Sequence, residues 1–312
     1  MMMKKLGKTG LKVSVLSFGA SALGGVFHAV DEKQGIRAVH AALDAGINYF
    51  DVAPAYGGTL AETVLGKALK DIPRERYFLS TKAGKYTKPG AYGNDRFDYT
   101  EKTIRSGLDA SMQRLGVDYL DIVHLHDFEY QNGRHVEAAF AKGFPTLVAL
   151  KSEGRIGAVG AGIYTMDVWQ RVIKEAPVDV ILMHNHYCLN DTRGIELVAP
   201  CAQINIGIIN ASPFASGLLT GSEIASWHPA RPQHRQLFEQ AAQFCKRAGY
   251  PLPKLAFQFA AQNDLFPTTM FSTARESSVK RNLEWYTEPI DTSLLSEVQN
   301  ILAPVMNHQW DY

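Results

Sequence analysis

Cysteine is scarce in this chain, and neither sign of charge is in excess. The three cysteines, Cys188, Cys201 and Cys245, are far apart and odd in number, whereas a secreted disulfide framework usually has a denser, even set. The 32 basic and 31 acidic side chains leave a net charge of +1. This balance argues against broad electrostatic binding of nucleic acid or of an anionic membrane. We therefore expect an intracellular protein whose partner is a small molecule.

Long apolar runs are also missing. No stretch of 18 apolar residues occurs, so no transmembrane helix is predicted. Residues 1–10 are basic and lack the apolar core of a signal peptide, so we expect a cytoplasmic protein, either a monomer or a small homo-oligomer. An apolar content of 46% over 312 residues is ordinary for a globular protein and excludes intrinsic disorder. We expect a single domain over residues 1–312.

Short apolar runs alternate with amphipathic helical patterns along the chain. The alternation predicts an α/β fold with a parallel sheet, and eight such units fit a closed (β/α)8 TIM barrel. An open, doubly wound sheet is the alternative. That fold usually has a Gly-x-Gly-x-x-Gly turn after the first strand. Residues 18–25 lack that spacing, so the barrel is preferred. The predicted strands are 13–18, 48–52, 77–81, 119–125, 156–161, 178–184, 206–210 and 268–272.

Three segments outside these units have predicted places in a barrel. Residues 6–11 are typical of a small hairpin, which we expect to close the N-terminal mouth as a cap. Two long polar stretches, 85–98 and 222–235, follow the third and seventh predicted strands. They are therefore expected on the C-terminal face, where barrels carry their active sites.

Common hydrolase and metalloprotease motifs are absent: the chain has no HExxH, GxSxG or EF-hand pattern. Two histidine pairs leave a metal site open as an alternative. His124 and His126 share one face of a strand, and so do His184 and His186. Together with Asp51 they could form a metal centre that activates water, as in barrel hydrolases. The ordinary alternative is that each histidine is a hydrogen-bonded residue of the barrel interior.

The ends of the second, third and fourth predicted strands carry four groups suited to acid-base chemistry: Asp51, Tyr56, Lys82 and His126. Free tyrosine has a pKa of about 10, and an adjacent lysine ammonium favours the phenolate and lowers that pKa. An aspartate would hold the lysine charged, and a histidine would orient the substrate oxygen. Such a phenol can exchange a proton with a carbonyl or alcohol oxygen. Hydride transfer to a nicotinamide cofactor is the natural partner step.

Each of these four residues also has an ordinary structural interpretation, such as a loop anchor, a wall aromatic, a surface lysine or a core histidine. Their order at neighbouring strand ends is what favours a shared site. The segments that carry them resemble the aldo-keto reductase family along nearly the whole chain. The resemblance implies a (β/α)8 barrel, an extended nicotinamide nucleotide across its C-terminal mouth, and Tyr56 as the acid-base residue. The matching segments are 48–51, 56–57, 62–66, 80–82 and 118–126.

Within the family, several separated segments resemble the L-galactose dehydrogenases and related aldose 1-dehydrogenases, some of which act on L-fucose. This resemblance implies oxidation of a neutral aldose at C1 to the lactone, with Tyr56 accepting the C1 hydroxyl proton. Alternatives are an NADPH-dependent carbonyl reductase, a cofactor-binding regulatory subunit, and the metal-dependent hydrolase. The segments are 18–27, 56–62, 126–129, 178–182 and 227–230.

The resemblance also implies a cofactor pocket, from which this chain departs in part. Many members have Ser-Asn where Gly162 and Ile163 stand here, a glutamine near Met183, and a stacking aromatic near Ala211. We expect NAD rather than NADP, because serines stand where relatives that prefer NADP have cations and because Glu276 would repel a 2′-phosphate. Arg275 is the feature that favours NADP. The predicted cofactor residues are Gly162, Ser212, Phe214, Ser216, Gly217, Leu218, Ser272, Arg275, Ser278 and Asn282.

The mouth loops offer hydrogen-bonding side chains for a neutral sugar. No metal ligand is assigned. The candidate substrate residues are His28, Asp127, Glu129, His184, His186 and Trp310.

Overall fold

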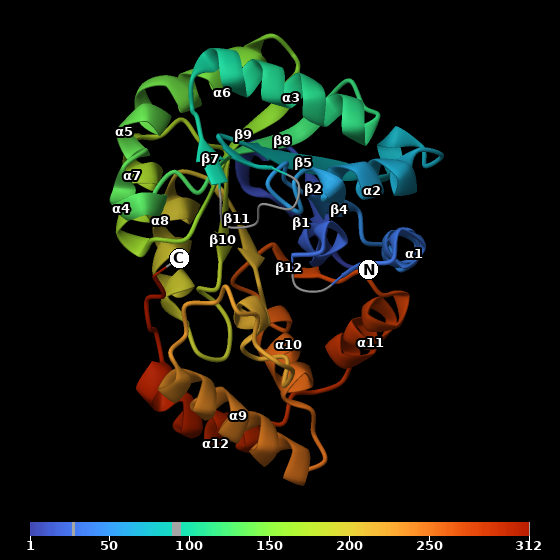
Figure 1. Cartoon of the computed structure of the whole chain (residues 1–312), viewed down its shortest axis with the longest axis vertical. Coiled ribbons are helices and arrows are strands. Elements are labelled where there is room, and N and C mark those ends of the chain that lie inside the picture. Colours follow the sequence, from blue (N-terminus) through green and yellow to red (C-terminus); the bar gives the residue numbers. More distant parts are fainter. Residues whose placement is uncertain (27–28, 89–94, 312) are drawn as a thin grey trace.

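The computed structural model describes residues 1–26, 29–88 and 95–311. Eight parallel strands close into a barrel with helices packed around its outside (Figure 1). Around the barrel the strands follow chain order, β3-β4-β5-β8-β9-β10-β11-β12, with β12 pairing back onto β3. The barrel strands are β3 (Leu16–Gly19), β4 (Tyr49–Asp51), β5 (Phe78–Ala83), β8 (Leu120–His126), β9 (Ile156–Ile163), β10 (Val180–His184), β11 (Gly207–Ala211) and β12 (Thr268–Ser272).

The predicted (β/α)8 barrel is confirmed, and each of the eight predicted strands overlaps a barrel strand. The first predicted strand is divided, because Val13 belongs to a separate strand, β2, and only residues from Leu16 onward join the barrel. The helices are α1 (Glu32–Asp44), α2 (Leu60–Leu69), α3 (Glu101–Leu115), α4 (Tyr130–Gly133), α5 (Val136–Ala138), α6 (Phe144–Ser152), α7 (Met166–Glu175), α8 (Val198–Gln203), α9 (Pro232–Arg247), α10 (Leu252–Ala261), α11 (Glu276–Thr287) and α12 (Thr292–Leu302).

An N-terminal hairpin closes the barrel at the N-terminal ends of its strands, as predicted, but residues 6–11 form only its connection and the paired strands lie on either side of them. Strands β1 (Met3–Lys5) and β2 (Lys12–Ser14) pair antiparallel, and the Lys8 amide donates to the carbonyl of Asn205 at 2.8 Å, just before β11. A Cβ on Gly7 would lie 2.1 Å from the backbone nitrogen of Gly207. Glycine is therefore required for the hairpin to approach the barrel this closely.

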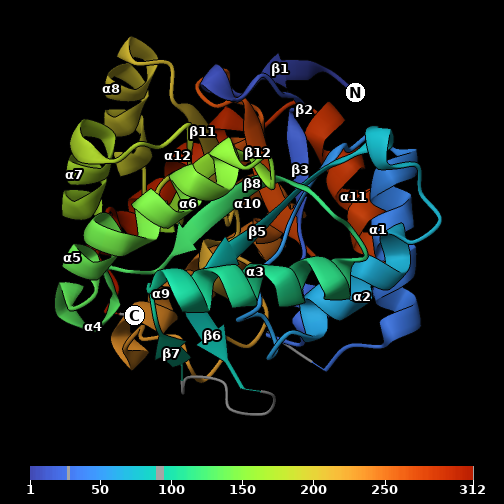
Figure 2. The same ribbon diagram turned by 90° about the horizontal axis from the view of Figure 1, so that it is seen from above.

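A second hairpin lies at the opposite end of the barrel. Strands β6 (Lys85–Thr87) and β7 (Asp95–Phe97) pair antiparallel within the predicted 85–98 loop. Figure 2 shows β1 at one end of the molecule and this hairpin at the other. The other long stretch, 222–235, is irregular until α9 begins at Pro232.

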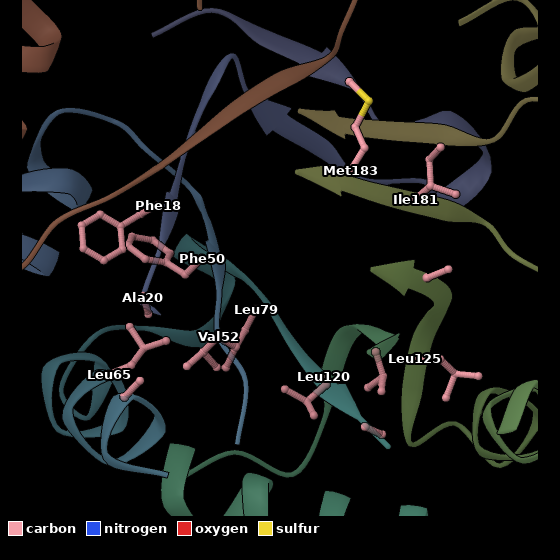
Figure 3. Packing of buried hydrophobic residues seen from close by; sticks show 14 of the residues in the cluster. Phe18, Ala20, Phe50, Val52, Leu65, Leu79, Leu120, Leu125, Ile181 and Met183 are labelled. Atoms are coloured by element: carbon pink, nitrogen blue, oxygen red, sulfur yellow. The ribbon is translucent and has the colours of Figure 1, made fainter. Parts of the chain in front are cut away.

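The main core lies between the barrel strands and the helices around them. Figure 3 shows Leu65 of α2 packed toward Val52 and Ala20, with the Phe18 and Phe50 rings close together on adjacent strands. The Phe18 and Phe50 ring centroids are 5.7 Å apart. Inside the barrel a smaller cluster includes Leu6 of the cap and Ile122 of β8. The cap therefore fills the N-terminal end of the barrel with apolar side chains. The polar side chains lie at the C-terminal end.

A buried ion pair ties α2 to its neighbours. Glu62 is fully buried, pairs with Arg114 of α3 at 2.6 Å, and accepts a hydrogen bond from Thr81 Oγ1 of β5 at 2.7 Å. Its oxygens are thus satisfied, as buried charges require. Thr81 directly precedes Lys82, so this pair fixes the strand on which the candidate lysine stands.

No helix within the described residues is long and apolar enough to cross a membrane.

Candidate active site

The structure brings the four predicted catalytic residues together at the C-terminal ends of β4, β5 and β8. Lys82 forms a buried ion pair with Asp51. Its Nζ lies 4.9 Å from the centroid of the Tyr56 ring. The Tyr56 and His126 rings meet edge to face with centroids 5.8 Å apart. A carboxylate, an ammonium, a phenol and an imidazole thus share one end of the barrel.

Asp51 and Lys82 are held by several hydrogen bonds. Ser80 Oγ donates to Asp51 Oδ1 at 2.6 Å, and Lys82 Nζ donates to Asp51 Oδ2 and to the carbonyl of Val52, the latter at 2.9 Å. Alternation along β5 places Ser80 and Lys82 on the same inward face. Both ionised groups are therefore oriented before any substrate arrives, which is the arrangement a catalytic pair needs.

Two glycines position the loop that carries Tyr56. Gly57 has a φ of +64°, and a Cβ there would lie 2.0 Å from the carbonyl oxygen of Gly24. A Cβ on Gly24 would lie 2.6 Å from the Tyr56 carbonyl carbon. Only glycine at both positions allows this contact. The turn after β3 thereby fixes where the Tyr56 ring stands.

Burial and charge shift the titration of this site. Burial alone would lower the pKa of Lys82, but the charges and hydrogen bonds of Asp51 and Tyr56 together outweigh it and the net pKa is raised. Lys82 therefore remains an ammonium. Burial raises the pKa of the Tyr56 phenol, against the lowering effect of the Lys82 charge and hydrogen bond. The prediction that the pKa of Tyr56 lies below that of free tyrosine is thus wrong for this site, because desolvation exceeds the effect of the lysine.

His126 is a neutral imidazole at physiological pH. Burial lowers its pKa well below the usual value, and the Lys82 and Lys85 ammonium groups add to this effect, while Asp127 opposes it. The backbone of His126 is fixed because the Tyr99 hydroxyl donates to its carbonyl at 2.6 Å. A neutral ring with one N–H can donate a hydrogen bond to a substrate oxygen.

The histidines of the metal alternative do not form a metal cluster with Asp51. Within the described ranges no three His, Cys, Asp or Glu side chains are placed to hold an ion. His186 is buried and its Nε2 contacts the Tyr164 carbonyl, while its Nδ1 lies 3.3 Å from Asp191. Both ring nitrogens of His186 thus have protein partners, so its prediction as a sugar contact is not supported.

The other predicted substrate residues have different surroundings. Asp127 directly follows His126, and half-buried His184 lies over the Tyr164 ring with centroids 5.4 Å apart. Glu129 accepts a hydrogen bond from the Tyr164 amide at 2.5 Å, and burial with the nearby Asp127 charge raises its pKa to about 8. The Trp310 amide donates to the Tyr164 hydroxyl at 2.9 Å, so the tail packs against this wall. His28 lies outside the described residues.

The end of β9 and the loop after β11 suit an extended nucleotide. At Gly162 a Cβ would sit 3.7 Å from the side chains of Lys82 and His124, so the missing side chain leaves space beside the catalytic lysine. Ser212, Ser216 and Gly217 have positive φ values of 65°, 53° and 104°. The Gly217 amide donates to the Phe214 carbonyl at 3.0 Å, so these turns fix the path of the loop at the mouth of the barrel. In the same loop Leu218 is buried, and Phe214 stacks on Phe257 with centroids 5.9 Å apart.

The start of α11 is suited to a negatively charged group. Arg275 is exposed and precedes the helix, and a helix N-terminus favours phosphate. Ser278 lies in the first turn and Asn282 is buried farther along the helix. The hydroxyl of Ser272 contacts Ser21 Oγ and the Ala22 amide, both at 2.9 Å, so it also links β12 to the turn after β3. These residues fit a nicotinamide nucleotide.

Sequence reasoning missed three residues that shape the site. Ser80 holds Asp51, Asn185 bonds Ser216 at 2.8 Å, and Lys85 bonds Asp127 at 2.7 Å. Ser80 had a usable signal, because it stands two residues before Lys82 on one strand face. Asn185 directly follows β10, which also marks the catalytic mouth. Lys85 had no signal, because its partner is set by the path of the hairpin.

Comparison with known proteins identifies the class. The model of the aldo/keto reductase family matches residues 15–303, so the chain belongs to this family. It is therefore an oxidoreductase of the kind that uses a nicotinamide cofactor and a small-molecule substrate.

Two curated relatives are similar over nearly the whole chain. L-galactose dehydrogenase of Arabidopsis thaliana is 38% identical, covering 99% of this chain and 96% of its own length. D-threo-aldose 1-dehydrogenase of a Pseudomonas species is 33% identical, covering 93% and 94%. Among solved structures, an aldo-keto reductase from Bacillus halodurans in its holo form has a TM-score of 0.77 at 25% identity, covering 96% of each chain. Glycerol dehydrogenase of Gluconobacter oxydans, at 20% identity with a TM-score of 0.73 and coverage of 98% and 97%, shows the fold alone.

Proposed function

We propose that this chain is an NAD(P)-dependent aldose 1-dehydrogenase that oxidises a neutral sugar of the L-galactose or L-fucose type to its lactone. The observation that carries the proposal is the buried Lys82–Asp51 ion pair with its ammonium against the Tyr56 ring. The choice of an aldose rests on the similarity to L-galactose dehydrogenase and D-threo-aldose 1-dehydrogenase.

Tyr56, Lys82 and His126 have different roles in the oxidation. Tyr56 takes the proton of the C1 hydroxyl, and the Lys82 charge stabilises the phenolate that must form to accept it. Neutral His126 donates a hydrogen bond to the same oxygen and so orients it. A nicotinamide nucleotide supplies the acceptor for the hydride that leaves C1 with its electron pair. The C1–O bond then becomes the carbonyl of the lactone.

We expect neutral aldoses to be better substrates than uronic acids or bulky hydrophobic aldehydes. The mouth carries Asp127 and Glu129, and an ionised Asp127 repels a second carboxylate. The measurement is kcat/KM for L-galactose, L-fucose and their uronic acids, with an aromatic aldehyde assayed in the reducing direction. Faster turnover of the aromatic aldehyde than of any aldose would favour the carbonyl reductase instead. Tight cofactor binding without turnover of any substrate would favour the regulatory subunit.

We expect NAD to be preferred over NADP by kcat/KM on the same aldose. Ser278 stands in the first turn of α11 where a cation would be needed, and Lys280 is engaged by Glu276 at 2.6 Å. Arg275 is exposed just before the helix and could turn toward a 2′-phosphate, and Arg281 is exposed on the same helix. A preference for NADP of about tenfold, which corresponds to roughly 1.4 kcal/mol, would contradict the expectation. Its loss in Arg275→Ala but not in Lys280→Ala would identify Arg275 as the phosphate ligand.

A further inference from the structure

Lys85 occupies an unusual position between the hairpin and the catalytic end of β8. It is the first residue of β6, and its side chain is only 12% exposed. Its ammonium bonds Asp127 Oδ2 at 2.7 Å and pairs with Asp95 of β7 at 3.1 Å. It also lies 4.5 Å from the centroid of the Tyr130 ring. One buried cation therefore connects both strands of the hairpin to the residue that follows His126.

One carboxylate oxygen of Asp127 lies close to both the Lys85 ammonium and the His126 imidazole. The same Oδ2 that binds Lys85 lies 3.5 Å from Nε2 of His126. The backbone of Asp127 has a φ of +49°, and its amide donates to the carbonyl of Gly162 at 3.0 Å. The backbone of Asp127 is therefore held at the end of β9, and its carboxylate lies between the Lys85 ammonium and the imidazole.

The charge of this carboxylate would favour a protonated imidazole. An unpaired anion within about 4 Å of a histidine raises the pKa of that histidine. Lys85 remains an ammonium, because Asp127 and Asp95 raise its pKa against the effect of burial. Its charge both stabilises ionised Asp127 and repels a proton on His126.

We propose that Lys85 is a positioning residue for the oxidation, which acts through Asp127 to keep His126 a neutral hydrogen-bond donor. This role rests on the proposed function, since it concerns the residue that orients the reacting oxygen. Lys85 itself need not touch the substrate. The β6–β7 hairpin thereby holds a buried positive charge beside the site.

Other ionisable groups also face His126 and Asp127, and their charges contribute to the pKa values of both. Glu129 follows Asp127 by two residues, and the two carboxyl groups repel each other when both are ionised. The groups that face His126 and Asp127 are Tyr56 from the loop after β4, Lys82 from β5, Lys85 from β6, Tyr99 before α3, Glu129 after β8 and His184 from β10.

The test replaces Lys85 by methionine and follows the imidazole directly. We expect Lys85→Met to raise the pKa of His126 by about one unit or more, the usual effect of an uncompensated neighbouring charge. The ring is observed by NMR in protein carrying labelled histidine, and its signal among the ten histidines is identified by its loss in His126→Gln. The acid limb of the kcat/KM profile should move upward with it. Lys85→Gln is the second variant should the methionine protein fail to fold.

Three controls separate this role from simple anchoring of the hairpin. Lys85→Arg keeps the charge and should keep the wild-type titration. Asp95→Asn removes the other carboxylate partner of Lys85 and should not raise the pKa of His126. In an Asp127→Asn background, Lys85→Met should cause a smaller upward shift, because only the direct repulsion between Lys85 and the imidazole is then lost.

An unchanged pKa of His126 in Lys85→Met and in Lys85→Gln would overturn the proposal, even if activity fell. An equal shift with Asp127→Asn present would overturn the route through Asp127. The NMR titration needs neither substrate nor turnover. A protein inactive on every aldose would therefore defeat the proposed function while this measurement still gave its own result.

Discussion

Tyr56→Phe is expected to lower kcat for aldose oxidation by about 10²–10⁴-fold, the usual contribution of general acid-base catalysis. The variant removes the hydroxyl that accepts the C1 proton and keeps the ring that packs edge to face on His126 and lies against Lys82. Cofactor affinity should therefore persist. The measurement is kcat at saturating aldose, together with the dissociation constant of the cofactor from protein fluorescence.

Tyr119→Phe is the matched control, because that side chain is 40% exposed just before β8, at the far end of the strand from His126. It should retain turnover close to wild type. If Tyr56→Phe kept more than about a tenth of the wild-type rate, Tyr56 could not be the acid-base residue. Loss of cofactor binding in the same variant would mean that the hydroxyl also supports the cofactor, because the ring is kept.

The barrel was predictable because its strands are buried on both faces and so appear as short, continuous apolar runs. The meeting of Asp51, Lys82 and His126 followed from the same pattern, since parallel strands present their C-terminal ends at one mouth. Tyr56 was harder to place, because its position depends on the contact between Gly24 and Gly57. That contact joins two loops, and strand periodicity carries no information about it.

Electrostatics in the site could not be obtained from residue types alone. The sequence shows that a lysine is close to Tyr56, but not how far the phenol is removed from water. Burial decides the net direction of its pKa. His186 illustrates the same difficulty, because its place on a strand end suggested a mouth residue, whereas its ring is turned onto Tyr164 and Asp191. Side-chain direction at a strand end depends on the loop that follows.

Lys82→Met is expected to have a large effect on both stability and activity. The variant leaves Asp51 buried without its cation, and breaking a buried pair in this way costs about 3–5 kcal/mol of the free energy of unfolding. Burial already raises the pKa of Asp51, against the lowering effect of Lys82. Without the lysine that pKa rises further, so the carboxyl is protonated at acid pH. The loss in free energy of unfolding relative to wild type, measured by urea denaturation, should therefore become smaller as pH falls and larger as pH rises.

The effect of Lys82→Met on activity has a separate cause. The lysine lowers the pKa of Tyr56 by its charge and its hydrogen bond, so its loss raises that pKa further. Each unit of increase reduces the phenolate fraction tenfold at a pH below the pKa, and the rise of kcat/KM with pH moves to higher pH. The double variant Asp51→Asn with Lys82→Met removes the orphaned charge as well. It should regain most of the stability but none of the activity, because Tyr56 still lacks its cation. Recovery of turnover in the double variant would show that Lys82 serves only to neutralise Asp51, and that the phenol works without it.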